Sequence, residues 1–86
     1  MIRVELFGIA RARAGRADVL LRAGTVREAM AALEEACPGL RPEVVCNGAL
    51  TEHFLLCREG GKILKDPSAP LAGGDVLLLM GAHAGG

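Results

Sequence analysis

The chain has 86 residues, which is the size of one small domain. Ten lysines and arginines balance ten aspartates and glutamates, so the chain lacks the basic excess typical of nucleic-acid-binding proteins. Hydrophobic residues make up 51% of the chain, enough for a folded core, whereas its aromatic residues are only Phe7 and Phe54. The N-terminus leads straight into an alternating segment, so we expect no signal peptide, and the longest apolar run, residues 76–82, is too short to cross a bilayer. We therefore expect a folded domain with neither nucleic acid nor membrane as a partner, and with little room for a deep catalytic pocket.

The cysteines and histidines predict no metal site. Cys37, Cys46 and Cys57 are odd in number and form no Cys-x-x-Cys pair, which argues against a disulfide framework, structural zinc or an iron–sulfur cluster. His53 and His83 are too few and too far apart to complete a ligand set with them. The expectation is three small buried thiols in a reducing, cytoplasmic compartment.

The N-terminal region predicts two paired strands. Residues 2–7 alternate, with Ile2, Val4 and Leu6 on one side, as in a half-buried strand. Residues 18–22 form a second strand candidate, and the short connection predicts antiparallel pairing with the first. Residues 10–15 between them are interpreted as a connector with room for one helical turn.

An amphipathic helix is predicted from Thr25 onward. Thr25-Val26-Arg27-Glu28 forms a capping box, in which the Thr25 hydroxyl accepts from the Glu28 amide and the Glu28 side chain reaches back to the Thr25 amide. Pro38-Gly39 ends the helix. Apolar side chains recur at helical spacing and are assigned to the core, at Val26, Ala29, Met30, Leu33 and Cys37.

The second half of the chain predicts more strands than helices. Asn47-Gly48 is a strong turn signal, and residues 71–75 form a second tight turn. The strand candidates are residues 43–46, 53–58, 62–65 and 76–80. One helix and one sheet predict an α+β fold with the helix lying across one face of the sheet.

The last strand candidate is apolar at every position, although one helix covers only one face of a sheet. Some apolar side chains must then point away from the helix. We predict a partner docking face that contains Phe7, Leu77 and Leu79. The alternative is a small sheet that simply exposes a few leucines to water.

The C-terminal segment carries the sharpest chemical signal. Its residues are small except for one histidine: Gly81, Ala82, His83, Ala84, Gly85 and Gly86. Such a segment is thin enough to enter a narrow channel, and a terminal glycine carboxylate has no Cβ beside it. An activating enzyme could join that carboxylate to AMP from ATP, and a sulfur donor could then replace AMP to leave a thiocarboxylate. The partner would supply every catalytic group, so we expect no enzyme activity and no bound cofactor; the alternative is a frayed terminus.

The chain resembles the ubiquitin-like β-grasp sulfur carriers, which include the small subunit of molybdopterin synthase and the thiamine-biosynthesis sulfur carrier. The resemblance covers the whole chain and is carried by the opening strand, the capped helix, Val45-Cys46-Asn47-Gly48, the segment 70–76 and Ala84-Gly85-Gly86. It implies a β-grasp domain over residues 1–80, with a mixed sheet of four to five strands packed on one main helix. Residues 81–86 would form a flexible Gly-Gly tail.

The resemblance also implies a reaction cycle and its partners. An E1-like adenylating enzyme would use ATP to activate Gly86, and the thiocarboxylate would then enter the large subunit of a sulfur-accepting synthase. The length favours the molybdopterin synthase small subunit. The alternatives are a carrier for thiamine, cysteine or tRNA thiolation, a ubiquitin-like protein modifier that forms isopeptide bonds, and a plain interaction module with an inert tail.

Overall fold

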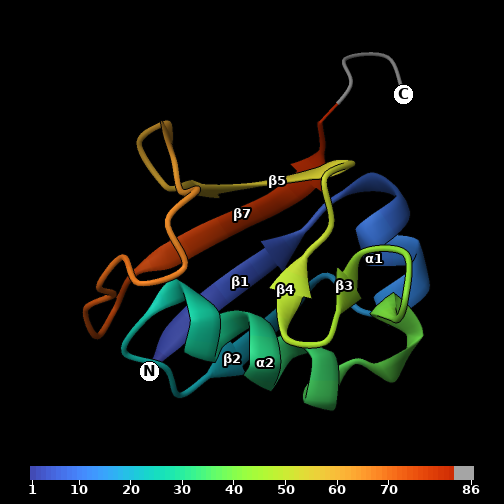
Figure 1. Cartoon of the computed structure of the whole chain (residues 1–86), viewed down its shortest axis with the longest axis horizontal. Helices are drawn as coiled ribbons and strands as arrows, with labels where there is room; N and C mark the ends of the chain where they lie inside the picture. The colour runs from blue at the N-terminus through green and yellow to red at the C-terminus, as the bar shows by residue number, and fades with distance from the viewer. Residues whose placement is uncertain (83–86) are drawn as a thin grey trace.

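A computed structural model describes residues 1–82 and shows a mixed sheet with a helix across one face (Figure 1). The strands of this sheet lie in the order β2-β1-β7-β5-β6. Their bounds are β1 Ile2–Leu6, β2 Asp18–Leu21, β5 Phe54–Arg58, β6 Lys62–Ile63 and β7 Val76–Gly81. The remaining elements are α1 Gly8–Ala14, α2 Val26–Ala36, a 3-10 helix η1 Pro38–Leu40, and a separate hairpin of β3 Val45–Cys46 and β4 Ala49–Leu50. The predicted α+β β-grasp architecture is confirmed.

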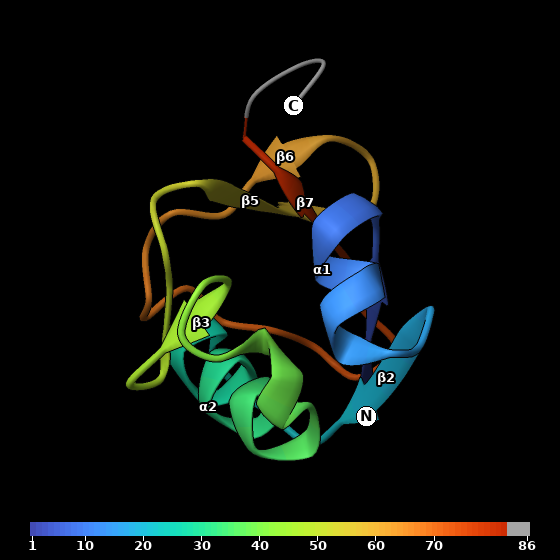
Figure 2. The same ribbon diagram turned by 90° about the vertical axis from the view of Figure 1, so that its right-hand side faces the viewer.

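The central strand of the sheet is β7, which has a neighbour on each side. It pairs in parallel with β1, which places Val4 beside Leu77 and Leu6 beside Leu79, and it pairs antiparallel with β5. β1 also pairs antiparallel with β2, as the short connection predicted. The buried faces of these strands pack under α2, which Figure 2 shows on the opposite side of the domain from the end of β7.

The start of α2 is capped nearly as predicted. The Thr25 hydroxyl accepts from the Glu28 amide at 3.2 Å. The Glu28 carboxylate, however, accepts from the Gly24 amide at 2.7 Å, one residue before the Thr25 amide that the capping box predicted. The next free amide, on Val26, donates to the Ala69 carbonyl of the loop before β7. The helix therefore begins with its first amides satisfied.

The connector between the first two strands is a helix rather than a loop. Alanine and arginine are strong helix formers, and α1 consists almost entirely of them. Gly8 has φ +58°, which lets the chain turn sharply from β1 into α1. Gly15 ends the helix in the left-handed conformation, and only Ala10 is fully buried. Because α1 has so little apolar surface, hydrophobic periodicity did not reveal it.

The segment after α2 is held by a two-residue turn, a hydrogen bond and an ion pair. Asn47 and Gly48 have φ of 53° and 76°, as expected for the predicted hairpin turn between β3 and β4. The Gly48 amide donates to the Glu34 carboxylate at 2.7 Å, and Arg41 pairs with the same carboxylate. These contacts fix the β3–β4 hairpin against α2.

The sheet extends further toward the C-terminus than predicted. β7 continues through Gly81, which lies opposite Phe54, and the Ala82 amide donates to the His53 carbonyl at 2.8 Å. Gly81 and Ala82 were expected in the tail, but the extended backbone before β5 offers them pairing partners, so they continue the sheet. The rest of the expected tail, His83, Ala84, Gly85 and Gly86, lies outside the described residues. No helix within residues 1–82 is long and apolar enough to cross a membrane.

Candidate functional site

The candidate site is the end of β7, where the chain leaves the sheet. The Phe7 amide donates to the Leu79 carbonyl at 3.0 Å on one side, and the Ala82 amide donates to the His53 carbonyl on the other. Figure 1 shows this end of β7 beside the turn that leads into α1. The point from which residues 83–86 continue is therefore set by hydrogen bonds to both neighbouring segments.

The predicted docking face needs correction at two of its three residues. Leu77 and Leu79 are fully buried under α2, because the register with β1 turns them toward the same side as Val4 and Leu6. In a strand that is apolar at every position, hydrophobic alternation cannot show which side chains face the core. Phe7 is on the surface, with 42% of its area exposed.

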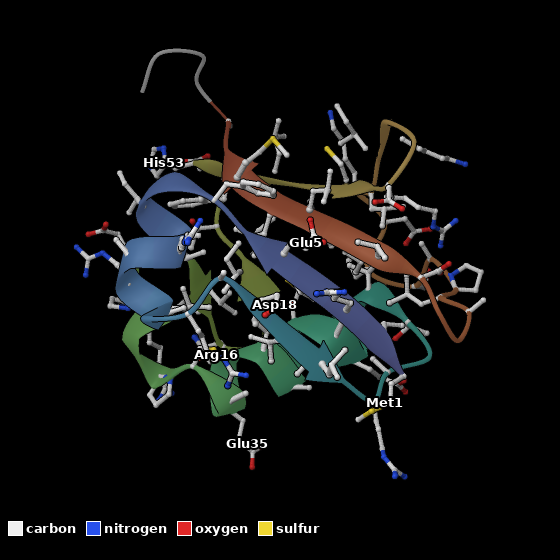
Figure 3. The ribbon with its side chains drawn as sticks, turned by 180° about the vertical axis from the view of Figure 1, so that it is seen from behind. Met1, Glu5, Arg16, Asp18, Glu35 and His53 are labelled. Carbon is white, nitrogen blue, oxygen red and sulfur yellow. The ribbon has the colours of Figure 1, made fainter. Side chains whose placement is uncertain are left out.

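The β7 side chains that point away from α2 are Val76, Leu78 and Met80, all partly buried. Met80 lies opposite Leu55, and Leu78 lies opposite Cys57, so the apolar strip extends onto β5. Figure 3 views the molecule from behind and looks onto this outer face. Its apolar half is formed by β5 and β7.

The other half of the outer face is mainly charged, although the exposed Leu20 lies on it opposite Arg3. Arg3 on β1 donates to Asp18 on β2 at 2.6 Å, and Glu5 lies 3.8 Å from the Arg3 guanidinium. The hydrogen bond from Arg3 to Asp18, together with their charges, raises the Arg3 pKa above its usual value. Glu5 and Asp18 are labelled on this side in Figure 3. A partner that uses the outer face thus meets an apolar half on β5 and β7 and an ion-paired half on β1 and β2.

A shallow hollow of about 520 Å³ adjoins the end of β7. Its walls come from the turn between β1 and α1, from the start of β5 and from β7, and they include Phe7, Ile9, His53, Met80 and Gly81. Ile9 is 55% exposed and lines this hollow. Sequence reasoning missed Ile9 because it assigned no role to the connector before residue 10.

The described residues offer no metal centre. Within residues 1–82 no three His, Cys, Asp or Glu side chains come close enough to hold a metal ion. All three thiols are free: Cys37 is buried, whereas Cys46 and Cys57 are partly exposed. Burial raises the pKa of the Cys37 thiol, which makes it a poor nucleophile. What the described part of the chain offers at the end of β7 is an open hollow with a largely apolar lining.

Comparison with known proteins supports this view of the fold. A scan against models of protein families finds no match, and neither does a sequence search of curated proteins. The solved structures do match, beginning with SAMP1 from Haloferax volcanii, which is 29% identical over 99% of this chain and 98% of that chain, with a TM-score of 0.82. A chain of the BexX/CysO complex from Amycolatopsis orientalis is 22% identical over 100% of both chains, with a TM-score of 0.80. A putative molybdopterin converting factor, subunit 1, from Pyrococcus furiosus is 18% identical over 91% of this chain and 92% of that chain, with a TM-score of 0.67.

These likenesses extend along nearly the whole chain, as did the resemblance inferred from the sequence motifs. The chain therefore has the ubiquitin-like β-grasp fold, and it is similar along nearly its whole length to SAMP1, a small archaeal modifier protein.

Proposed function

We propose that this protein is a sulfur carrier whose reactive group is the Gly86 carboxylate. The observation that carries the proposal is the end of β7: hydrogen bonds on both sides hold the chain as far as Ala82, and His83-Ala84-Gly85-Gly86 follow it in the sequence. A rigid body that presents a thin segment suits a partner that must enclose the terminal carboxylate. No side chain of the described residues has to take part in the chemistry.

The proposed chemistry has two steps, both in a partner's active site. A Gly86 carboxylate oxygen attacks the α-phosphorus of ATP, which releases pyrophosphate and leaves an acyl-adenylate. Hydrosulfide, or an equivalent sulfur donor, then attacks the acyl carbon, the bond from carbon to the AMP oxygen breaks, and AMP leaves with the electron pair. The product is a thiocarboxylate, and glycine suits both steps because it places no side chain beside the carbon under attack.

For the sulfur acceptor we propose molybdopterin synthase, with this chain as the small subunit. The proposal is supported by the chain length and by the likeness to the putative molybdopterin converting factor subunit from P. furiosus. The tail would enter the active site of the large subunit and donate its sulfur there. Carriers for thiamine, cysteine or tRNA thiolation share the first two steps and differ only in this acceptor.

A second candidate function is protein modification, and the likeness to SAMP1, named a small archaeal modifier protein, favours it. In that case a lysine amine of a target protein attacks the acyl-adenylate carbon, AMP leaves, the amine loses a proton, and an isopeptide bond forms. Both functions need the same activated Gly86. They differ in whether sulfur or an amine displaces AMP.

The test is intact-mass spectrometry of the full chain after incubation with an E1-like adenylating enzyme, ATP and sulfide. A carrier exchanges one oxygen for one sulfur, whereas a modifier forms higher-mass conjugates when lysine-containing proteins are added. The matched control is the chain that lacks Gly86, which should do neither. If the full chain stays unchanged with every adenylating enzyme from its own organism, the proposed function is wrong.

A further inference from the structure

We infer that two copies of this chain pair along the free edge of β2, antiparallel and with Leu20 of each copy opposite Leu20 of the other, so that their two sheets join into one. This edge is separate from the site proposed above, because β1 lies between β2 and β7. The self-association therefore does not depend on the proposed function.

One side of β2 has no neighbouring strand. β2 lies at the end of the strand order, and within residues 1–82 only β1 pairs with it. The Leu6 amide donates to the Ala17 carbonyl at 2.8 Å, and because bonding alternates along an antiparallel pair, the main chains of Asp18 and Leu20 face the open side. The Asp18 carbonyl accepts there from the exposed Arg16 side chain at 3.1 Å. This side of β2 is therefore open to a donor, and a second strand could supply backbone amides in place of that side chain.

The side chains along this edge follow a simple order. Val19 and Leu21 are buried, so alternation places Asp18, Leu20 and Arg22 on the outer face. Leu20 is 61% exposed although it lies within a strand. Figure 3 labels Asp18 on β2, at the margin of the sheet. The edge thus presents an acid, a leucine and a base at successive outward positions.

This order is complementary to itself. In an antiparallel pair centred on Leu20, the two leucines face each other, and the Asp18 of each copy faces Arg22 of the other copy. A register shifted by two residues would instead place Leu20 opposite a charged side chain. Since opposite charges directly across a pair of strands stabilise it and like charges destabilise it, the side chains favour one register and a second copy as the partner.

The ion pairs of the single chain are consistent with this partner. Arg3 is the only cation paired with two carboxylates, at 2.6 Å from Asp18 and 3.8 Å from Glu5, among the ion pairs of residues 1–82. None of those pairs includes Arg22, whose side chain is exposed. Pairing of two copies brings Arg22 of the second copy to Asp18, so a carboxylate that shares its cation gains a second one.

The paired arrangement leaves the end of each β7 accessible. The two copies of β7 run in opposite directions and are separated by five strand spacings of about 4.8 Å, or roughly 24 Å. Two short strands bury much less than the roughly 1,200 Å² of a stable specific interface, so we expect a dissociation constant of about 0.1–1 mM.

Sedimentation equilibrium of the full chain tests the pairing, over concentrations from about 10 μM to 1 mM that bracket the expected dissociation constant. The average mass of the wild type should rise from that of one chain toward that of two. Leu20→Asp and Leu20→Lys each place two like charges opposite one another, and each should weaken association by about tenfold or more. An equimolar mixture of these two variants places Asp opposite Lys and should regain association. The matched control is Ile63→Asp on the opposite edge strand β6, where Ile63 is 46% exposed, and it should associate like the wild type.

Each alternative result has a distinct meaning. A wild type that stays monomeric at 1 mM would overturn the inference and leave the proposed function standing, because no adenylating enzyme enters the measurement. Association of both Leu20 variants at the wild-type level, or its loss in Ile63→Asp alone, would place the contact elsewhere and overturn the inference. A mixture that stays monomeric would contradict the register centred on Leu20. Circular dichroism melting checks that each variant is folded, and regained association in the mixture cannot come from unfolded chains.

Discussion

The two ends of β7 are built in opposite ways. At its start, the Asp75 carboxylate accepts from the Ala72 amide at 2.8 Å and lies 3.3 Å from Arg58. The Asp75 carbonyl also accepts from the Arg3 amide at 2.9 Å. The polar groups at this end therefore bond to one another. The turn before the strand is held by the hydrogen bond between Ala72 and Asp75.

At its other end, β7 is bordered by exposed apolar side chains. Two backbone bonds, from Phe7 and from Ala82, hold the strand there, while Phe7 and Ile9 present their surfaces to solvent. Exposed apolar area does not stabilise the isolated domain, and it favours association with other proteins. The comparison teaches that side-chain bonds reinforce the start of β7, whereas backbone bonds alone hold its end, beside exposed apolar side chains.

The largest expected effect comes from Gly86→Ala, which changes only the segment that follows β7 in the sequence. A Cβ beside the carboxylate misplaces the reacting carbon, so thiocarboxylate formation should fall by about 100-fold or more. The rate is measured by intact mass under single-turnover conditions. The melting temperature should equal that of the wild type, and wild-type transfer by this variant would contradict the role of glycine at the reactive end.

Leu79→Ala should produce the largest loss of stability, because Leu79 is fully buried in the core. Removing the side chain leaves a cavity and should lower the free energy of unfolding by about 3 kcal/mol. Replacing its neighbour Met80, on the outer face, by alanine should lower the free energy of unfolding by less than about 1 kcal/mol. Urea denaturation measures both, and equal losses would show that the two faces of β7 are not distinct.

Asp75→Ala tests the closed end of the strand. It removes the acceptor of the Ala72 amide and the partner of Arg58, and should cost about 1–2 kcal/mol of unfolding free energy. Asp75→Asn keeps an acceptor and removes the charge, so it should cost less. Both variants should be adenylated with the wild-type KM; a raised KM would remove the distinction between the two ends.

The smallest effect is a difference in thiol reactivity between the core and the outer face. Because burial raises the pKa of Cys37, less of it is thiolate at a given pH, and its side chain is also shielded from reagent. At pH 8 iodoacetamide should therefore label Cys46 and Cys57, both partly exposed, well before Cys37. Peptide mapping follows the labelling, and denaturant should equalise the three rates; equal rates in the native protein would mean that the core opens readily.

Local sequence patterns predicted most of the fold. The alternation in residues 2–7, the Thr25 cap and the Asn47-Gly48 turn each depend on neighbours a few residues apart, and the structure confirms them. The orientation of Leu77 and Leu79 depends instead on the register with β1, which is more than 70 residues away in the chain. No local pattern in an all-apolar strand carries that information.

The candidate site was predicted less fully than the fold. Gly86 stood out by composition alone, and its role remains a prediction. The hollow beside the end of β7 depends on α1, whose alanines and arginines show no apolar stripe, so nothing in the sequence pointed to Ile9 as a surface residue. Its significance follows only from where the turn after β1 meets the end of β7.

The central claim is that the main-chain terminus, and no side chain, carries the sulfur. Fragmentation mass spectrometry of the protein after reaction with ATP, adenylating enzyme and sulfide locates the sulfur atom directly. We predict that it replaces one oxygen in the C-terminal fragment that contains Gly86, with every cysteine-containing fragment unchanged. Sulfur added to Cys46 or Cys57, with the Gly86 carboxylate unaltered, would contradict the claim.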